Sequence, residues 1–278
     1  MRPVGLHCRL VENVSSLLDK SLMLKSSIMQ CFFLPQGAAT YPEFSSEEKA
    51  LCLEKKKHFT HLFLHASYWV NLAGRYRNGW RPFKRELELA KEFGFTHMVI
   101  HPGSATGCTT KEEGIEYLAK ALNKILKEED TIKIVLENTA HANKTVGGDI
   151  ADFQKLVTLL DQPEKIWFCL DTAHAYSYGY DLSSDQAIDD FIAYVDTMIG
   201  FQRVVSLHIN DASEKCGSRI DKHEIPGKGN IGKKLLTRFM NHEKLRNIPI
   251  ILEVPGFENK GPDKKNKDIL KQALQDSF

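Results

Sequence analysis

Short apolar runs of strand type recur along the chain, and six of eight such runs end on a residue that can bind a metal ion. The six runs are HLFLH, HMVIH, IKIVLE, IWFCLD, VVSLH and IPIILE, which end on His65, His101, Glu137, Asp171, His208 and Glu253. Successive ends lie 36, 36, 34, 37 and 45 residues apart, which is close to the length of a strand, a helix and two loops. This spacing predicts repeated β–α units whose strands end at a common edge.

The strand candidates alternate with amphipathic helical patterns. The eight candidates are residues 4–7, 28–34, 61–65, 97–101, 132–137, 166–171, 204–209 and 248–253. Helical periodicity follows in the segments that begin at Phe83, Gly114, Asp149 and Ala187. Strict alternation predicts a parallel sheet, and eight units most simply close into one (β/α)8 TIM-barrel domain over residues 1–278, with its active site at the C-terminal mouth. An open doubly wound sheet is the alternative, but six strand ends of an open sheet could not all reach one site.

Composition limits the classes of partner and compartment. The formal net charge is +1, so a general basic surface cannot supply affinity for nucleic acid, and any such footprint must be local. The six cysteines form no CxxC pair, which is typical of a reducing compartment. The sequence shows no signal-peptide block and no long apolar span. We therefore expect a soluble, cytoplasmic protein with no membrane contact, and a monomer.

Three further ligand-type residues lie in the loops, and they bring the set to nine: His174, Asp221 and His223. A single histidine at a strand end is more often a hydrogen-bonded core residue, but six strand ends in register favour a shared site. Carboxylates gathered there without partners would repel one another, and divalent cations resolve that repulsion. Four carboxylates and five neutral imidazoles suit three divalent ions, zinc first, with manganese or iron as alternatives at one or more sites.

The other histidines lack this placement. His61 and His97 begin their strands, so we expect them at the opposite end of the barrel. His7 ends the first strand candidate, which would bring it toward the site, but we predict no ligand role for it.

Several motifs resemble those of the endonuclease IV family of apurinic/apyrimidinic endonucleases, over residues 5–253. They are HPGS (101–104), LENT (136–139), LDTAHA (170–175), GYDL (179–182), LHIND (207–211), GSRIDKH (217–223) and GKGNIG (227–232). The resemblance implies a first zinc held by His65, His101 and Glu137. It implies a second zinc that shares Glu137 and is completed by Asp171, His208 and Glu253, and a third zinc held by His174, Asp221 and His223.

The resemblance also implies an activity. The family cleaves duplex DNA on the 5′ side of an abasic sugar and trims blocked 3′ ends. A hydroxide between the first two metals would attack phosphorus, with Glu137 and Glu253 as the catalytic carboxylates that orient it. A missing base lowers the energy needed to extrude a nucleotide, so flipping would supply selectivity.

The departures from the family lie in the DNA-facing loops. The first-strand loop reads CRLVE at residues 8–12, where the family has a small, glycine-containing run, and residues 34–41 lack the family's arginine. After the third strand, Tyr68 stands at the family's intercalating position, followed by Trp69. Residues 75–85 then hold five cations and three aromatics, which suits phosphate contact and base stacking, or else a solvated loop with a helix start. The predicted DNA contacts are Tyr68, Trp69, Arg75, Arg77 and Arg81.

Two other readings stay open at this point. Sugar isomerases and epimerases of the related barrel group use one or two metals, and their ligand set would lack the trio His174, Asp221 and His223. A binding module without catalysis is the other, and the complete ligand set argues against it. The lysines in residues 258–268 are typical of a solvated loop.

Overall fold

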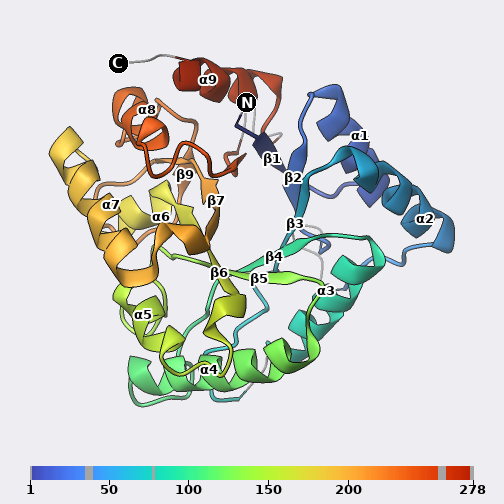
Figure 1. Cartoon of the computed structure of the whole chain (residues 1–278), viewed down its shortest axis with the longest axis horizontal. Coiled ribbons are helices and arrows are strands. Elements are labelled where there is room, and N and C mark those ends of the chain that lie inside the picture. The colour runs from blue at the N-terminus through green and yellow to red at the C-terminus, as the bar shows by residue number, and fades with distance from the viewer. Residues whose placement is uncertain (1, 35–39, 77–78, 256–260, 276–278) are drawn as a thin grey trace.

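The computed structural model describes residues 2–34, 40–76, 79–255 and 261–275. Eight parallel strands close into a barrel in the order β1-β10-β7-β6-β5-β4-β3-β2, and helices surround it (Figure 1). The strands are β1 (Val4–Cys8), β2 (Ile28–Cys31), β3 (His61–His65), β4 (His97–Ile100), β5 (Lys133–Glu137), β6 (Ile166–Asp171), β7 (Val204–His208) and β10 (Ile250–Leu252). The predicted TIM barrel is confirmed.

Helices and short 3-10 turns connect the strands. The helices are α1 (Val14–Met23), α2 (Ser46–Lys55), α3 (Trp80–Glu92), α4 (Lys111–Glu128), α5 (Ala151–Val157), α6 (Thr172–Tyr178), α7 (Asp185–Ile199), α8 (Lys233–Asn241) and α9 (Lys264–Gln275), and the 3-10 turns are η1 (Lys56–His58), η2 (Pro163–Lys165) and η3 (Phe201–Arg203). Side-chain oxygens at the N-caps fix several starts, because each accepts from an otherwise unpaired backbone N–H. The caps of α1, α2, α4 and α7 are Asn13, Ser45, Thr110 and Ser184.

The interior of the barrel is filled by one apolar side chain from each of six strands. These residues are Ile28, Phe63, Val99, Val135, Cys169 and Ile251. Side chains two positions apart on a strand share a face, so the residue two positions later points into the same interior, nearer the C-terminal mouth. In five of these six strands, that later position holds a predicted ligand: His65, His101, Glu137, Asp171 and Glu253. The alternation of each strand therefore aims the ligands at a common point.

The opposite end of the barrel holds the two histidines that begin their strands. His97 stacks on Phe63 with ring centroids 4.5 Å apart, and His61 meets His97 edge-on at 4.9 Å. Burial lowers the pKa of His97 to about 3, helped by the charges of His61 and Lys133. These rings belong to the packed floor of the barrel, as the sequence predicts.

Two sequence expectations need correction. The second strand ends at Cys31 rather than at residue 34, because Phe33 turns away to pack on Phe93 and Phe95. The expected solvated loop at residues 258–268 is wrong for its second half, which begins α9. There Lys267 is buried, and its Nζ donates to the carbonyl of Leu24 at 2.6 Å. Residues 256–260 lie outside the described part of the chain.

No helix among the described residues is long and apolar enough to cross a membrane.

Candidate metal centre

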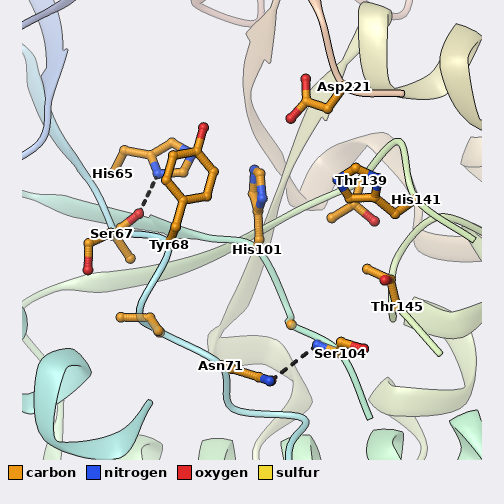
Figure 2. A pocket seen from close by; sticks show the side chains of 13 residues that line it. His65, Ser67, Tyr68, Asn71, His101, Ser104, Thr139, His141, Thr145 and Asp221 are labelled. Atoms are coloured by element: carbon orange, nitrogen blue, oxygen red, sulfur yellow. Dashed lines mark hydrogen bonds between the residues drawn. The ribbon is translucent and has the colours of Figure 1, made fainter. Parts of the chain in front are cut away.

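The nine predicted ligands come together at the C-terminal mouth of the barrel. Four end strands, two follow a strand by one residue, His174 lies in the first turn of α6, and Asp221 and His223 lie on the segment that enters the hairpin strand β9 (His223–Glu224). Ligand atoms lie within 4.8 Å of one another in three groups: His65, His101 and Glu137; Glu137, Asp171, His208 and Glu253; and Asp171, His174 and His223. Figure 2 shows His65, His101 and Asp221 around one pocket.

The groups overlap, which places shared carboxylates between them. Glu137 belongs to the first and second groups, and Asp171 to the second and third. Asp221 was predicted for the third group, and its Oδ1 lies 3.2 Å from Nε2 of His174 and 3.3 Å from Nε2 of His223. The structure thus adds Asp171 to the predicted trio and keeps Asp221 beside both imidazoles.

Backbone carbonyls fix the orientation of three ligand imidazoles. Nδ1 of His65 donates to the carbonyl of Ala66 at 2.8 Å, and Nδ1 of His174 donates to the carbonyl of Asn138 at 2.8 Å. Nδ1 of His223 donates to the carbonyl of Glu253 at 3.2 Å. In each ring Nε2 is then the atom with a lone pair, which is the tautomer that metal-binding histidines adopt.

These lone pairs face other electron-rich atoms. Nε2 of His65 lies 3.1 Å from Oε2 of Glu137, and Nε2 of His174 lies 3.3 Å from Nε2 of His223. Such pairs repel unless a cation or a proton lies between them. The donor set therefore fits divalent ions bound by nitrogen and oxygen, which is the ligand chemistry of zinc.

The pKa values show how strongly the site requires positive charge. Burial alone would raise the pKa of Glu137, but the charges of His208 and His101 hold it well below its usual value. Burial would lower the pKa of His174, and Asp171 with Asp221 raises it well above its usual value instead. The same carboxylates that favour protonated imidazoles would favour metal cations in their place.

Asn138 and Asn210 hold Asp171 in position. Oδ1 of Asn138 accepts from the backbone N–H of Asp171 at 2.7 Å, and Nδ2 of Asn210 donates to Oδ2 of Asp171 at 2.6 Å. The other oxygen of Asp171 accepts from the N–H of His174 at 2.8 Å and so caps α6. Asn138 follows Glu137 in the LENT motif, and Asn210 lies two residues after His208 in the LHIND motif. This closeness to a predicted ligand is the sequence signal that could have identified both asparagines.

Sequence reasoning assigned no role to His7 or Gln30, yet both contact Glu253. Nδ1 of His7 donates to Oε1 of Glu253 at 2.9 Å, and the Gln30 amide donates to the same oxygen. Oε1 of Gln30 accepts from Nε2 of His208 at 3.1 Å. His7 and Gln30 are register partners on β1 and β2, so neighbouring strands hold the carboxylate from one side.

Comparison with known proteins identifies the family. Residues 29–275 match the family described as Xylose isomerase-like TIM barrel. The chain is 32% identical over 263 residues to the probable endonuclease 4 of Heliobacterium modesticaldum, covering 91% of this chain and 93% of that protein. The chain belongs to the endonuclease IV family.

Two further members of the family match over nearly their whole length. The probable endonuclease 4 of Thermotoga maritima is 28% identical over 98% of this chain and 96% of its own. The crystal structure of endonuclease IV from Thermus thermophilus is 27% identical, with a TM-score of 0.83 over 99% of this chain and 100% of that one.

Asp211 is the last residue of the LHIND motif, and it stabilises the β-hairpin that carries His223 of the third ligand group. Strand β8 (Asp211–Ala212) pairs with β9, and the buried Asp211 carboxylate accepts from the backbone N–H groups of Gly227, Gly229, Ile231 and Gly232. A Cβ on Gly229 would lie 2.6 Å from Oδ1 of Asp211, so only glycine permits this approach. Asp211 therefore anchors the GKGNIG loop to β8, which pairs with the strand that carries His223.

The predicted aromatic contacts stand at the entrance to the centre. Tyr68 is 80% exposed and Trp69 64% exposed, and both line a cleft of about 900 Å³ that also contains His65, His174 and Glu253. In Figure 2 the Tyr68 ring stands beside His65, over the pocket.

The predicted cationic segment is only partly a loop. Arg75 and Arg81 are exposed, and Arg77 lies outside the described residues. Helix α3 already begins at Trp80, and Phe83 is buried in the core, so Phe83 cannot stack on a base. The Trp80 ring faces Nζ of Lys124 at 5.0 Å. Base stacking on Phe83 is therefore excluded, and the alternative of a loop that leads into a helix start describes residues 80–85.

Proposed function

We propose that the chain is an apurinic/apyrimidinic endonuclease of DNA repair. It hydrolyses the phosphodiester on the 5′ side of an abasic site in duplex DNA, leaves a 3′-hydroxyl, and trims blocked 3′ ends. The observation that carries the proposal is the set of three overlapping ligand groups at one mouth of the barrel. Membership of the endonuclease IV family supports the same activity.

The ligands divide among three zinc ions, with manganese or iron as alternatives. His65, His101 and Glu137 would hold the first; Glu137, Asp171, His208 and Glu253 would hold the second; and His174, Asp221 and His223, with Asp171 beside them, would hold the third. Bound divalent ions of this kind lower the pKa of water and neutralise charge on a phosphoryl group.

Glu137 and Glu253 are the proposed catalytic carboxylates. Glu137 is fully buried between two ligand groups, whereas the Glu253 side chain is slightly exposed and lines the cleft. Glu253 therefore reaches the incoming phosphodiester and orients the attacking water, with Glu137 beside it. His7 and Gln30 hold Oε1 of Glu253, so its carboxylate plane is fixed before substrate arrives.

Substrate selection is assigned to the aromatic pair and the nearby cations. Tyr68 and Trp69 wedge the base stack, and Arg75, Arg77 and Arg81 hold phosphates beside the flipped sugar. Unstacking costs a few kcal/mol, and inserted rings offset part of that cost. An abasic nucleotide is extruded most easily because it has lost its stacking base.

An incision assay tests the proposal. A duplex with one internal abasic site and its intact counterpart are incubated with the pure protein, before and after chelator treatment. We expect cleavage of the abasic strand only, a 3′-hydroxyl that a polymerase can extend, loss with chelator, and recovery with zinc. Ketose substrates are the comparison for the isomerase reading. Turnover of a ketose without incision would overturn the proposed function.

A further inference from the structure

Helix α3 carries a buried carboxylate that faces the loops after β2 and β3. Glu86 is 0% exposed and lies on the core side of the helix, with Phe83, Leu89 and Ala90. Among the residues that the structure describes, it forms no ion pair. An unpaired buried acid is costly, so its hydrogen-bond partners determine what it does.

Both partners of Glu86 belong to loops at the mouth of the barrel. Oε2 accepts from the backbone N–H of Ser67 at 3.0 Å, in the loop after β3. Oε1 accepts from the hydroxyl of Tyr41 at 2.6 Å, in the segment after β2. A carboxylate is suited to this place because it accepts from both donors and presents no donor of its own.

The loop that Glu86 holds carries the exposed aromatic pair. Ser67 lies between the ligand His65 and the ring of Tyr68. In the described part of the chain, the Tyr68 ring is tilted against Phe32 at 6.1 Å and meets His101 edge-on at 6.2 Å between ring centroids, and the side chain is 80% exposed. With so little packing of its own, this ring depends on the backbone for its position. The carbonyl of Ser67 also accepts from the N–H of Val70 at 2.9 Å, which turns the chain at this point.

We propose that Glu86 is a positioning residue that, with Tyr41, fixes residues 66–69 so that Tyr68 and Trp69 stand ready at the entrance of the metal centre. The proposal rests on the proposed function, because it concerns the aromatic pair assigned to DNA. It differs from the catalytic assignment in that Glu86 touches no proposed ligand and acts through the Ser67 backbone. Loss of the Glu86 carboxylate should therefore affect substrate capture and leave the metal centre intact.

Fluorescence of Trp69 tests the anchoring without DNA. Trp80→Phe with Trp167→Phe leaves Trp69 as the single tryptophan of the chain. In that background, Glu86→Ala should lower the anisotropy of Trp69 and increase its quenching by acrylamide. Glu86→Gln keeps one acceptor oxygen and should give a smaller change of the same sign. This milder variant keeps the test possible if Glu86→Ala does not fold. Glu88→Gln, an exposed carboxylate on the same helix, is the matched control. Unchanged Trp69 signals in both Glu86 variants would overturn the proposal.

A double-mutant cycle then tests the link to DNA. Glu86→Ala should raise KM for an abasic duplex roughly tenfold, the effect of losing hydrogen bonds to a charged group, while kcat and bound zinc stay nearly unchanged. In combination with Tyr68→Ala it should add little, because both changes remove the same wedge. Additive effects would mean that Glu86 does not act through Tyr68. If the parent protein shows no incision, the proposed function fails, whereas the fluorescence result still decides the anchoring.

Discussion

Gln30 accepts a hydrogen bond from Nε2 of His208 at 3.1 Å, and this contact sets which nitrogen of the ring faces the metal centre. Nδ1 then carries the lone pair, and it lies 3.1 Å from Oε1 of Glu137 and 3.1 Å from Oε2 of Glu253. A neutral amide on β2 thus fixes the tautomer of His208, a proposed ligand on β7, and holds Glu253 as well.

Gln30→Leu should weaken metal binding. The variant leaves Nε2–H of the buried His208 ring without its acceptor and releases one side of Glu253. Loss of such an outer partner typically costs roughly 10–100-fold in metal affinity. Competition with a graded chelator, followed by metal analysis, measures this cost. Gln186→Leu makes the same change at an exposed position of α7 and should have no effect. Equal metal retention in the two variants would exclude Gln30 from the centre.

Glu253→Gln should separate catalysis from binding. The amide keeps the size of the side chain but weakens coordination and the orientation of the attacking water. We expect turnover on an abasic duplex to fall at least roughly a hundredfold, with duplex affinity largely kept. Glu224→Gln, which changes another carboxylate of the same cleft, is the control. Near-normal turnover of Glu253→Gln would remove this residue from the mechanism.

Acid should destabilise the barrel partly through His97. Burial holds the pKa of His97 at about 3, below its usual 6.5. Between these values the unfolded chain binds a proton that the folded chain does not, so stability is fully present above the unfolded pKa and is lost as pH falls toward the folded one. His97→Phe keeps the stack on Phe63 and should reduce the pH slope of the free energy of unfolding by up to about one proton.

Denaturant titrations of chelator-treated protein across the acid range measure that slope. Chelator treatment of parent and variant removes the contribution of metal release. His58→Phe makes the same change at an exposed site and is the control. A His97→Phe slope that also equals the parent slope would show that this ring titrates normally in the folded protein.

The affinity for duplex DNA should depend on salt concentration through three arginines. Replacing Arg75, Arg77 and Arg81 by glutamine should weaken binding to any duplex and reduce the salt slope by roughly one unit per lost phosphate contact. Lys120, Lys124 and Lys127 on α4 are exposed, and their replacement removes the same charge as a control. An unchanged salt slope in the arginine variant would move the search to the lysines around α9.

Tyr68→Ala with Trp69→Ala should mainly lower the preference for abasic over intact DNA.

The clustering of the six predicted strand-end ligands could be predicted from sequence because strand periodicity carries the information. Phe63 and His65 lie two positions apart, so one fills the barrel and the other must point to its mouth. His7 and Gln30 could not be found in this way. Their contact with Glu253 depends on the pairing of β1 with β2. His7 does end its strand candidate, but glutamine is not a ligand type, so nothing local marks Gln30.

The burial of Phe83, which was expected as a stacking ring, has a physical cause that the sequence contains. Phe83, Glu86 and Ala90 recur at three- and four-residue steps on the buried face of α3, and that period extends the helix back to Trp80. Pro82 is compatible with it, because the first turn of a helix needs no intrahelical N–H donors.

The metal content of the purified protein tests the central claim most directly. Elemental analysis of protein prepared without chelator should give about three divalent ions per chain, mainly zinc, since eight of the nine nitrogen and oxygen ligands fall into three groups and Asp221 lies beside the third. Acid should release metal and activity together, because the imidazole ligands must be neutral to bind. One ion or none per chain, in protein that still cleaves an abasic duplex, would contradict the three-metal centre.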